Sequence, residues 1–313
     1  MDRLIRKVHQ AFACPGSTQA GAHYRQLSKH NSMTPGIGFA LGAMLCFGVS
    51  DLIYKRGATA GFSAGEFLMS QAWIFCPGVT LYAWLTGTLH PQLSALWGGL
   101  AGLFLFIALF NFTRSLQSGA VSTNAPIFRL NFTITAALAI LLLGESFNAA
   151  KAVALICALI AVWLLLVDAG AQRGKASLPS LVRVLVATVA MALTNLFYKI
   201  GLQSGALPET MVAAQAWVFC SLATVFGVLG GGFRVTRGIW RYAAGAAVAL
   251  FGAFVALMYG LALGPASVLV PVAQMSFVFT ALLGAALFNE PLDAKKYAGL
   301  AIAAGALVLF GVS

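Results

Sequence analysis

The sequence predicts an all-α membrane protein with ten transmembrane helices in two inverted five-helix repeats. Of its 313 residues, 60% are hydrophobic and only 9% are charged, so a water-soluble fold would lack the polar surface that covers a core. Apolar stretches of about 20 residues, the length that crosses roughly 30 Å of hydrocarbon, recur along nearly the whole chain after residue 34. An internal repeat is the third observation, and it sets the architecture.

Apolar runs bounded by Gly, Pro or charged residues define the ten spans. In the first half they cover residues 35–55, 64–87, 94–116, 121–143 and 149–168. In the second half they cover residues 181–201, 207–230, 239–262, 266–288 and 293–312. We therefore expect four segments: a polar basic tail over 1–34, a first repeat over 35–168, a linker over 169–180 and a second repeat over 181–313.

The tail lacks the apolar core of a signal peptide, and we expect it to be disordered. Because Met33 directly precedes the first span, a second hypothesis is that translation begins there. The formal net charge of +11 does not indicate nucleic-acid binding, because the Lys and Arg residues lie mostly in the tail or between spans. The partner that this pattern predicts is the lipid bilayer, through its headgroups.

The two halves repeat each other residue by residue. Tyr54-Lys55 recurs as Tyr198-Lys199, and Gln71-Ala72-Trp73 recurs as Gln215-Ala216-Trp217, both displaced by 144 residues. Six further pairs are displaced by 145 residues: Ser122 and Ser267, Pro126 and Pro271, Phe132 and Phe277, Thr135 and Thr280, Glu145 and Glu290, Lys151 and Lys296. Five spans is an odd number, so the second copy enters the membrane from the opposite side. Inverted repeats are typical of alternating-access transporters.

Several local features recur in order within both halves: a first span ending in Lys55 and again in Lys199, short turns at 117–120 and 264–266, and Gly144-Glu145 after the fourth span. In these features residues 36–312 resemble the drug/metabolite transporter superfamily, in its EamA-type ten-helix branch. The resemblance implies a permease for amino acids, metabolites or other small solutes, often an exporter in a bacterial inner membrane. The chain departs from the family pattern at Gln71 and Gln215, where the family often has a basic residue, and at Asn289, where the family has Gly before the residue that matches Glu290.

Arg129 is the first candidate for binding a substrate. It lies about eight residues inside the fourth span, roughly 12 Å from the start of the helix, where a guanidinium is costly without a partner. We expect it to attract a carboxylate or phosphate of the substrate. The alternatives are a structural ion pair with Asp51 or an Arg that reaches the interface.

Asp51 is the candidate for proton coupling, because an intramembrane carboxylate can load and release a proton. Its counterpart in the second half is neutral, Asn195. The alternative is a simple ion pair with Lys55, four residues later. Protons are therefore a candidate partner of transport.

Gln71 and Gln215 lie in mid-span, each two residues before a Trp, and are candidates for hydrogen bonds to a polar solute flanked by Trp73 and Trp217. The alternative is that Gln bonds to a neighbouring helix while Trp packs against helix or lipid. The remaining candidates come from polar stripes of the spans: Tyr54, Asn131, Asn195 and Gln274.

We expect Pro126 and Pro271 to loosen the first turns of the fourth and ninth spans as hinges, or to be ordinary first-turn prolines. We interpret Glu145 and Glu290 as solvated, or as caps of the helix that follows each. Ser and Thr in the spans can simply bond to their own helix.

A membrane-embedded enzyme and a helical scaffold or receptor are the competing functions. The spans supply no His and no paired carboxylates, so we expect no enzyme, no cofactor and no metal site. A scaffold would not need an intramembrane Arg129 or a repeated Gln.

The resemblance implies that both termini lie in the cytoplasm. In that orientation several loops rich in Lys and Arg are external. The positive-inside rule favours the opposite orientation, with these loops in the cytoplasm. These residues are Lys55, Arg56, Arg173, Lys175, Arg234, Arg237, Lys295 and Lys296. The basic tail offsets them only if it is translated.

Overall fold

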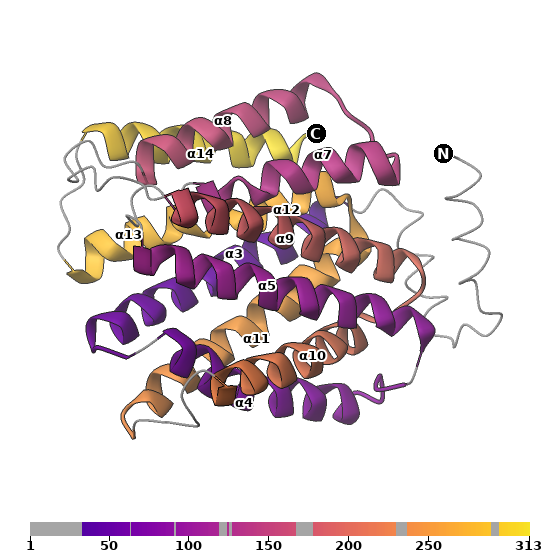
Figure 1. The fold of residues 1–313 in the computed structure, drawn as a ribbon. Coiled ribbons are helices and arrows are strands. Elements are labelled where there is room, and N and C mark those ends of the chain that lie inside the picture. The colour runs from indigo at the N-terminus through magenta and orange to yellow at the C-terminus, as the bar shows by residue number, and fades with distance from the viewer. Residues whose placement is uncertain are drawn as a thin grey trace.

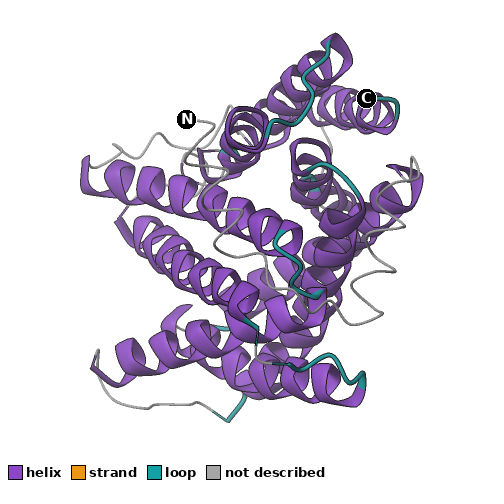
Figure 2. Ribbon diagram, turned by 90° about the vertical axis from the view of Figure 1, so that its right-hand side faces the viewer, coloured by secondary structure: helices purple, strands orange, loops and turns teal. Residues whose placement is uncertain are grey.

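The computed structural model describes residues 33–62, 64–90, 92–118, 124, 127–166, 178–229, 237–288 and 294–313. Within these residues the regular elements are helices joined by short loops, without a strand (Figure 2). This is the structure that a lipid solvent imposes, because a helix satisfies its backbone hydrogen bonds internally. Most of the expected tail and linker lies outside the described residues. The last two tail residues belong to the first helix, and residues 178–180 belong to the sixth span.

The described part of the chain forms ten spans, as the sequence predicts. The first repeat contains α3 (Met33–Thr59), α4 (Ala64–Leu85), the short 3₁₀ helix η1 (Leu93–Ala95), α5 (Leu96–Ser118), α7 (Asn131–Leu143) and α8 (Ala149–Leu166). The second repeat contains α9 (Leu178–Gln203), α10 (Pro208–Leu229), α11 (Ile239–Leu263), α12 (Ala266–Gln274), α13 (Ser276–Phe288) and α14 (Ala294–Gly311). Six of these described helices are long and apolar enough to cross a membrane unaided.

The fourth and ninth spans are broken, whereas the sequence predicted continuous helices over 121–143 and 266–288. The breaks fall at Leu130 and Met275. The Leu130 amide turns back to the Ile127 carbonyl at 3.1 Å, and the Met275 amide is shared between the carbonyls of Pro271 at 3.1 Å and Val272 at 3.2 Å. The two positions are displaced by 145 residues, so the break belongs to the repeat. Pro271 lies inside α12 and has no N–H to donate, which weakens the helix shortly before the break. The loosened turn thus follows Pro271 by four residues instead of lying at the helix start. Pro126 lies outside the described residues.

The repeats interlock, because the first helix of each packs into the other repeat. α3 packs against α11, α12 and α13 of the second repeat, and α9 packs against α5 and α7 of the first. In Figure 1 the helices run roughly across the picture, with α8 and α14 paired at one edge of the bundle and α4 and α10 near the other. The helices on which the broken spans pack therefore come from the opposite repeat.

Small residues bring α5 and α10 together. A Cβ on Gly98 would lie 2.6 Å from the Met211 carbonyl oxygen, and one on Gly102 would lie 2.5 Å from that of Gln215. Both distances are shorter than any real contact, so the two glycines let the backbones approach, as in small-xxx-small packing of membrane helices.

The repeat extends to side-chain hydrogen bonds. The Tyr198 hydroxyl donates to Gln215 Oε1 at 2.7 Å, and the Tyr54 hydroxyl donates to Gln71 Oε1 at the matching position. Each bond joins the first and second helices of its own repeat. The duplication seen in the sequence is thus a duplication of structure.

Candidate functional site

The candidate site is a group of polar side chains at the two helix breaks, which we name the break-point cluster: Asp51, Arg129, Gln274, Ser276 and Thr280. Arg129 lies one residue before the break of the fourth span, and Gln274 holds the equivalent place in the ninth. A helix break frees these positions to face each other across the repeats. The Arg129 guanidinium donates to Gln274 Oε1 at 3.3 Å.

Asp51 and Arg129 form an ion pair with Nη2 and Oδ2 separated by 2.9 Å. This is the structural ion pair that the sequence left open beside a substrate-binding role. Weaker contacts from the Ser276 and Thr280 hydroxyls, at 3.3 and 3.4 Å, reach the same Oδ2 atom. The Asp51 side chain is 34% exposed and that of Arg129 is 19% exposed, so neither side chain is fully buried. The Lys55 side chain, the other partner considered for Asp51, lies outside the described residues.

The equivalent place in the other repeat is neutral and closed. Asn195, the counterpart of Asp51, donates to Thr135 Oγ1 at 3.4 Å, which reproduces the contact between Asp51 and Thr280. The Oδ1 atoms of Asn195 and Asn131 are buried and have no hydrogen-bond partner. Buried polar atoms of this kind are rare and costly. A solute reaches them only if this half of the bundle opens.

Thr135 and Thr280 also donate to the carbonyls four residues earlier, at 2.9 and 3.0 Å. This is the local bonding to the helix backbone that the sequence analysis weighed for Ser and Thr.

Gln71 and Gln215 are buried and accept hydrogen bonds from Tyr54 and Tyr198, which is the interhelical bonding weighed as their alternative. The neighbouring tryptophans lie on the outside of the bundle. Trp73 is 48% exposed and donates from its indole N–H to Thr224 at 3.1 Å, and Trp217 is 56% exposed. Such exposure suits packing against lipid. The structure thus groups Asp51, Arg129 and Gln274, and it places the Tyr and Gln pairs separately between first and second helices.

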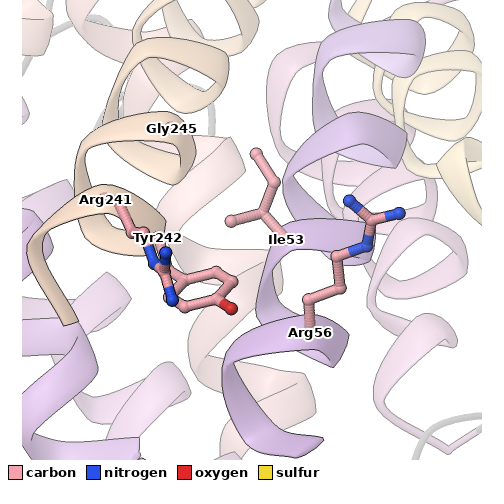
Figure 3. A pocket seen from close by; sticks show the side chains of 5 residues that line it. All are labelled: Ile53, Arg56, Arg241, Tyr242 and Gly245. Atoms are coloured by element: carbon pink, nitrogen blue, oxygen red, sulfur yellow. The ribbon is translucent and has the colours of Figure 1, made fainter. Parts of the chain in front are cut away.

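A cavity of about 330 Å³ opens between the last turns of α3 and the first turns of α11 (Figure 3). Ile53 and Arg56 line it from α3, and Arg241, Tyr242 and Gly245 line it from α11. The Arg241 guanidinium lies 5.2 Å from the centre of the Tyr242 ring. Ile53 follows Asp51 by two residues and therefore points to nearly the opposite side of α3, towards α11, so the cavity is separate from the break-point cluster.

A second polar cluster was missed from the sequence. It contains Glu145, Lys151, Lys199 and Ser267, and it lies where α9 and α11 end and α12 begins. The sequence analysis interpreted Glu145 as solvated or as the cap of the helix that follows it. In the structure Glu145 instead caps α12 of the other repeat. A signal was present, because all four residue types recur in the duplicate, as Glu290, Lys296, Lys55 and Ser122. The cap expected of Glu290 lies outside the described residues.

No group of three His, Cys, Asp or Glu side chains that could hold a metal ion occurs within the described ranges.

Comparison with known proteins matches a family model described as "EamA-like transporter family" to residues 34–167 and again to 178–312. The chain belongs to the EamA-like transporter family. The double match coincides with the two interlocked repeats, and this EamA-like protein is therefore a multi-pass membrane transporter of the drug/metabolite type.

The fold of this EamA-like protein also resembles a solved structure described only as "Crystal structure of protein". The two chains superpose with a TM-score of 0.74 at 16% sequence identity, over 88% of this chain and 95% of the other. At that identity the likeness concerns the fold alone. No curated protein matches the sequence.

Proposed function

We propose that this EamA-like protein is an alternating-access exporter of small organic solutes that carry an anionic group, such as amino acids and related metabolites. The observation that carries the proposal is the ion pair of Asp51 and Arg129, partly exposed and placed at the breaks of both discontinuous helices. Discontinuous helices that meet between inverted repeats are typical substrate sites of secondary transporters.

Arg129 would bind the anionic group by exchanging partners. A guanidinium offers five donors in a planar fork and binds carboxylates in two-pronged geometry. In the structure it donates to Asp51 and to Gln274, so a solute carboxylate replaces one or both acceptors and keeps the guanidinium paired. Asp51, once released, either pairs with a cationic group of the solute or takes up a proton. The second outcome would couple transport to a proton gradient.

The break-point cluster supports binding from one face at a time. The side chains of Asp51 and Arg129 are partly exposed, while the equivalent half around Asn195 is buried. Exchange of the two repeat conformations would reverse this asymmetry. We propose a bacterial inner membrane as the location, with both termini in the cytoplasm, so that the described state faces outward.

Transport into and out of proteoliposomes tests the proposal. The purified chain is reconstituted, and counterflow of labelled amino acids and other small metabolites is followed with and without a pH gradient. Movement of at least one anionic or zwitterionic solute, lost in Arg129→Gln, supports it. A chain that is inserted and folded but moves no solute under any gradient would refute it. A reporter fused to the C-terminus, active only in the cytoplasm, tests the orientation.

A further inference from the structure

The carboxylate of Glu145 is fixed by the end of its own helix. Gly144 adopts a left-handed conformation with φ of 67°, and the Glu145 amide donates to the Ala139 carbonyl at 3.3 Å. This is the hydrogen bond that closes a helix through a left-handed glycine. The turn directs the backbone of Glu145 out of α7 and towards α12.

Both carboxylate oxygens of Glu145 bind the start of α12. Oε1 accepts from the Ala266 amide at 2.7 Å, and Oε2 accepts from the Ser267 amide at 2.8 Å. The first amides of a helix have no partner within it, and the helix dipole favours a negative charge there. A carboxylate of the first repeat therefore caps the broken ninth span of the second repeat.

Two lysines complete this cluster. Lys199 donates to the carbonyls of Leu261 and Gly264, both at 2.7 Å, and thereby caps the end of α11. Lys151, only 1% exposed, donates to the Ser146 carbonyl at 2.6 Å and to Ser267 Oγ at 3.2 Å. The two lysines thus bind the end of α11 and the start of α12, beside the amides that the Glu145 carboxylate caps.

The cluster lies at the face of the bundle where α14 ends, and the cavity of Figure 3 lies at the opposite face. At the first face, Glu145, Lys151 and Lys199 bind backbone and hydroxyl groups that hold the end of α11 and the start of α12, while the second face carries the open cavity. In an inverted repeat, alternating access exchanges the conformations of the two halves. A contact between non-equivalent positions, such as Glu145 and Ser267, is then present in only one of the two states.

We propose that Glu145, Lys151, Lys199 and Ser267 form an ionic latch that holds the α14 face closed and opens in the other transport state. The latch rests on the proposed alternating access. Opening the latch breaks both hydrogen bonds of the Glu145 carboxylate at once, so the latch limits how often this face opens. It acts on α12 as a unit, because the break at Met275 lets this nine-residue segment move separately from α13.

Cysteine accessibility of the purified full chain in detergent micelles tests the latch. In a background with Cys14, Cys46, Cys76, Cys157 and Cys220 replaced by Ala, one reporter is Val270→Cys, buried on α12 one turn beyond the latch. The other is Ile53→Cys in the cavity of the opposite face. A maleimide that both faces can meet should label Ile53→Cys quickly and Val270→Cys slowly.

Glu145→Gln should raise the labelling rate of Val270→Cys about tenfold or more and lower that of Ile53→Cys. The reason is that Gln has one accepting oxygen where Glu145 uses two, and it loses the negative charge that favours the start of α12. Ser267→Ala, which removes only the Lys151 contact, should change both rates in the same directions by less. Glu66→Gln, a carboxylate in the first turn of α4 at the opposite face, is the matched control and should leave the labelling rate of Val270→Cys unchanged.

Two results would overturn the latch. One is a labelling rate of Val270→Cys that is slow in the parent and equally slow in Glu145→Gln. This result would refute the latch but not alternating access. The other is a rise at Val270→Cys without a fall at Ile53→Cys, which would make Glu145 a local cap. If Val270→Cys is never labelled in any variant or with any solute, alternating access itself fails, and the latch fails with it.

Discussion

Replacing Arg129 by Gln gives the first repeat the residue that the second repeat carries at the equivalent position, Gln274. The change removes the cation that lies 2.9 Å from Asp51 and retains a group that can still hydrogen-bond to it. If Arg129 binds the anionic group of the solute, the variant should insert and fold but transport poorly.

The size of the effect follows from the hydrogen bonds that are lost. A hydrogen bond to a charged group contributes about 1.5–3 kcal/mol, and each 1.4 kcal/mol is a factor of about ten in affinity. The pair is partly exposed, so water screens the charges and the lower end of the range applies to a single bond. A solute carboxylate bound through one strong contact should therefore lose about tenfold in affinity, and one bound through both prongs about a hundredfold.

Solute uptake into proteoliposomes at several concentrations measures this loss as a rise in KM. Arg129→Lys should fall between the parent and Arg129→Gln, because Lys keeps the charge but cannot bind a carboxylate with two prongs. An unchanged KM and rate in Arg129→Gln would show that the guanidinium serves only to pair Asp51. The reasoning about substrate binding would then be wrong.

Three further outcomes are expected. Asp51→Asn should abolish the dependence of transport on a pH gradient; transport that stays equally dependent on the gradient would remove Asp51 from coupling. Gly102→Ala places a methyl group 2.5 Å from the Gln215 carbonyl and should destabilise the chain by about 1–3 kcal/mol in thermal unfolding, whereas Gly305→Ala, with open space around it, should not. Cys76 and Cys220 are equivalent residues of the two repeats on the packed helices α4 and α10, so mild oxidation should cross-link these helices. When the two repeats exchange conformations, a contact between equivalent residues is the same contact in both states. The cross-linked protein should therefore still transport; a full block of transport that reduction reverses would contradict this.

The sequence predicted the architecture well because the duplication preserves side chains as well as hydropathy. Tyr54 with Gln71 and Tyr198 with Gln215 were matched by displacement, and the structure joins each pair by a hydrogen bond. The ion pair of Asp51 with Arg129 was one of three interpretations of Arg129 in mid-span, since a charge within a span needs a partner whichever function it serves.

Other features could not be predicted, for physical reasons. Leu130 and Met275 are ordinary apolar residues, and nothing in their own chemistry marks a break. The partners of Glu145 are backbone amides more than a hundred residues away, and an amide carries no sequence signature. Hydropathy marked Trp73 and Trp217 as spanning residues, but not which side of the helix faces lipid.

The interlocking of the repeats has a consequence for how the chain is made. α3 ends at Thr59, whereas α11, against which it packs most closely, begins at Ile239. About 180 residues separate them, and at roughly 5–20 residues per second α3 waits on the order of ten seconds or more before its partner leaves the ribosome. During that interval Asp51 lies in the bilayer without α12 or α13 beside it. The youngest intermediates of synthesis are therefore the most exposed to membrane quality control, and a chain truncated before α11 should be degraded and not stored.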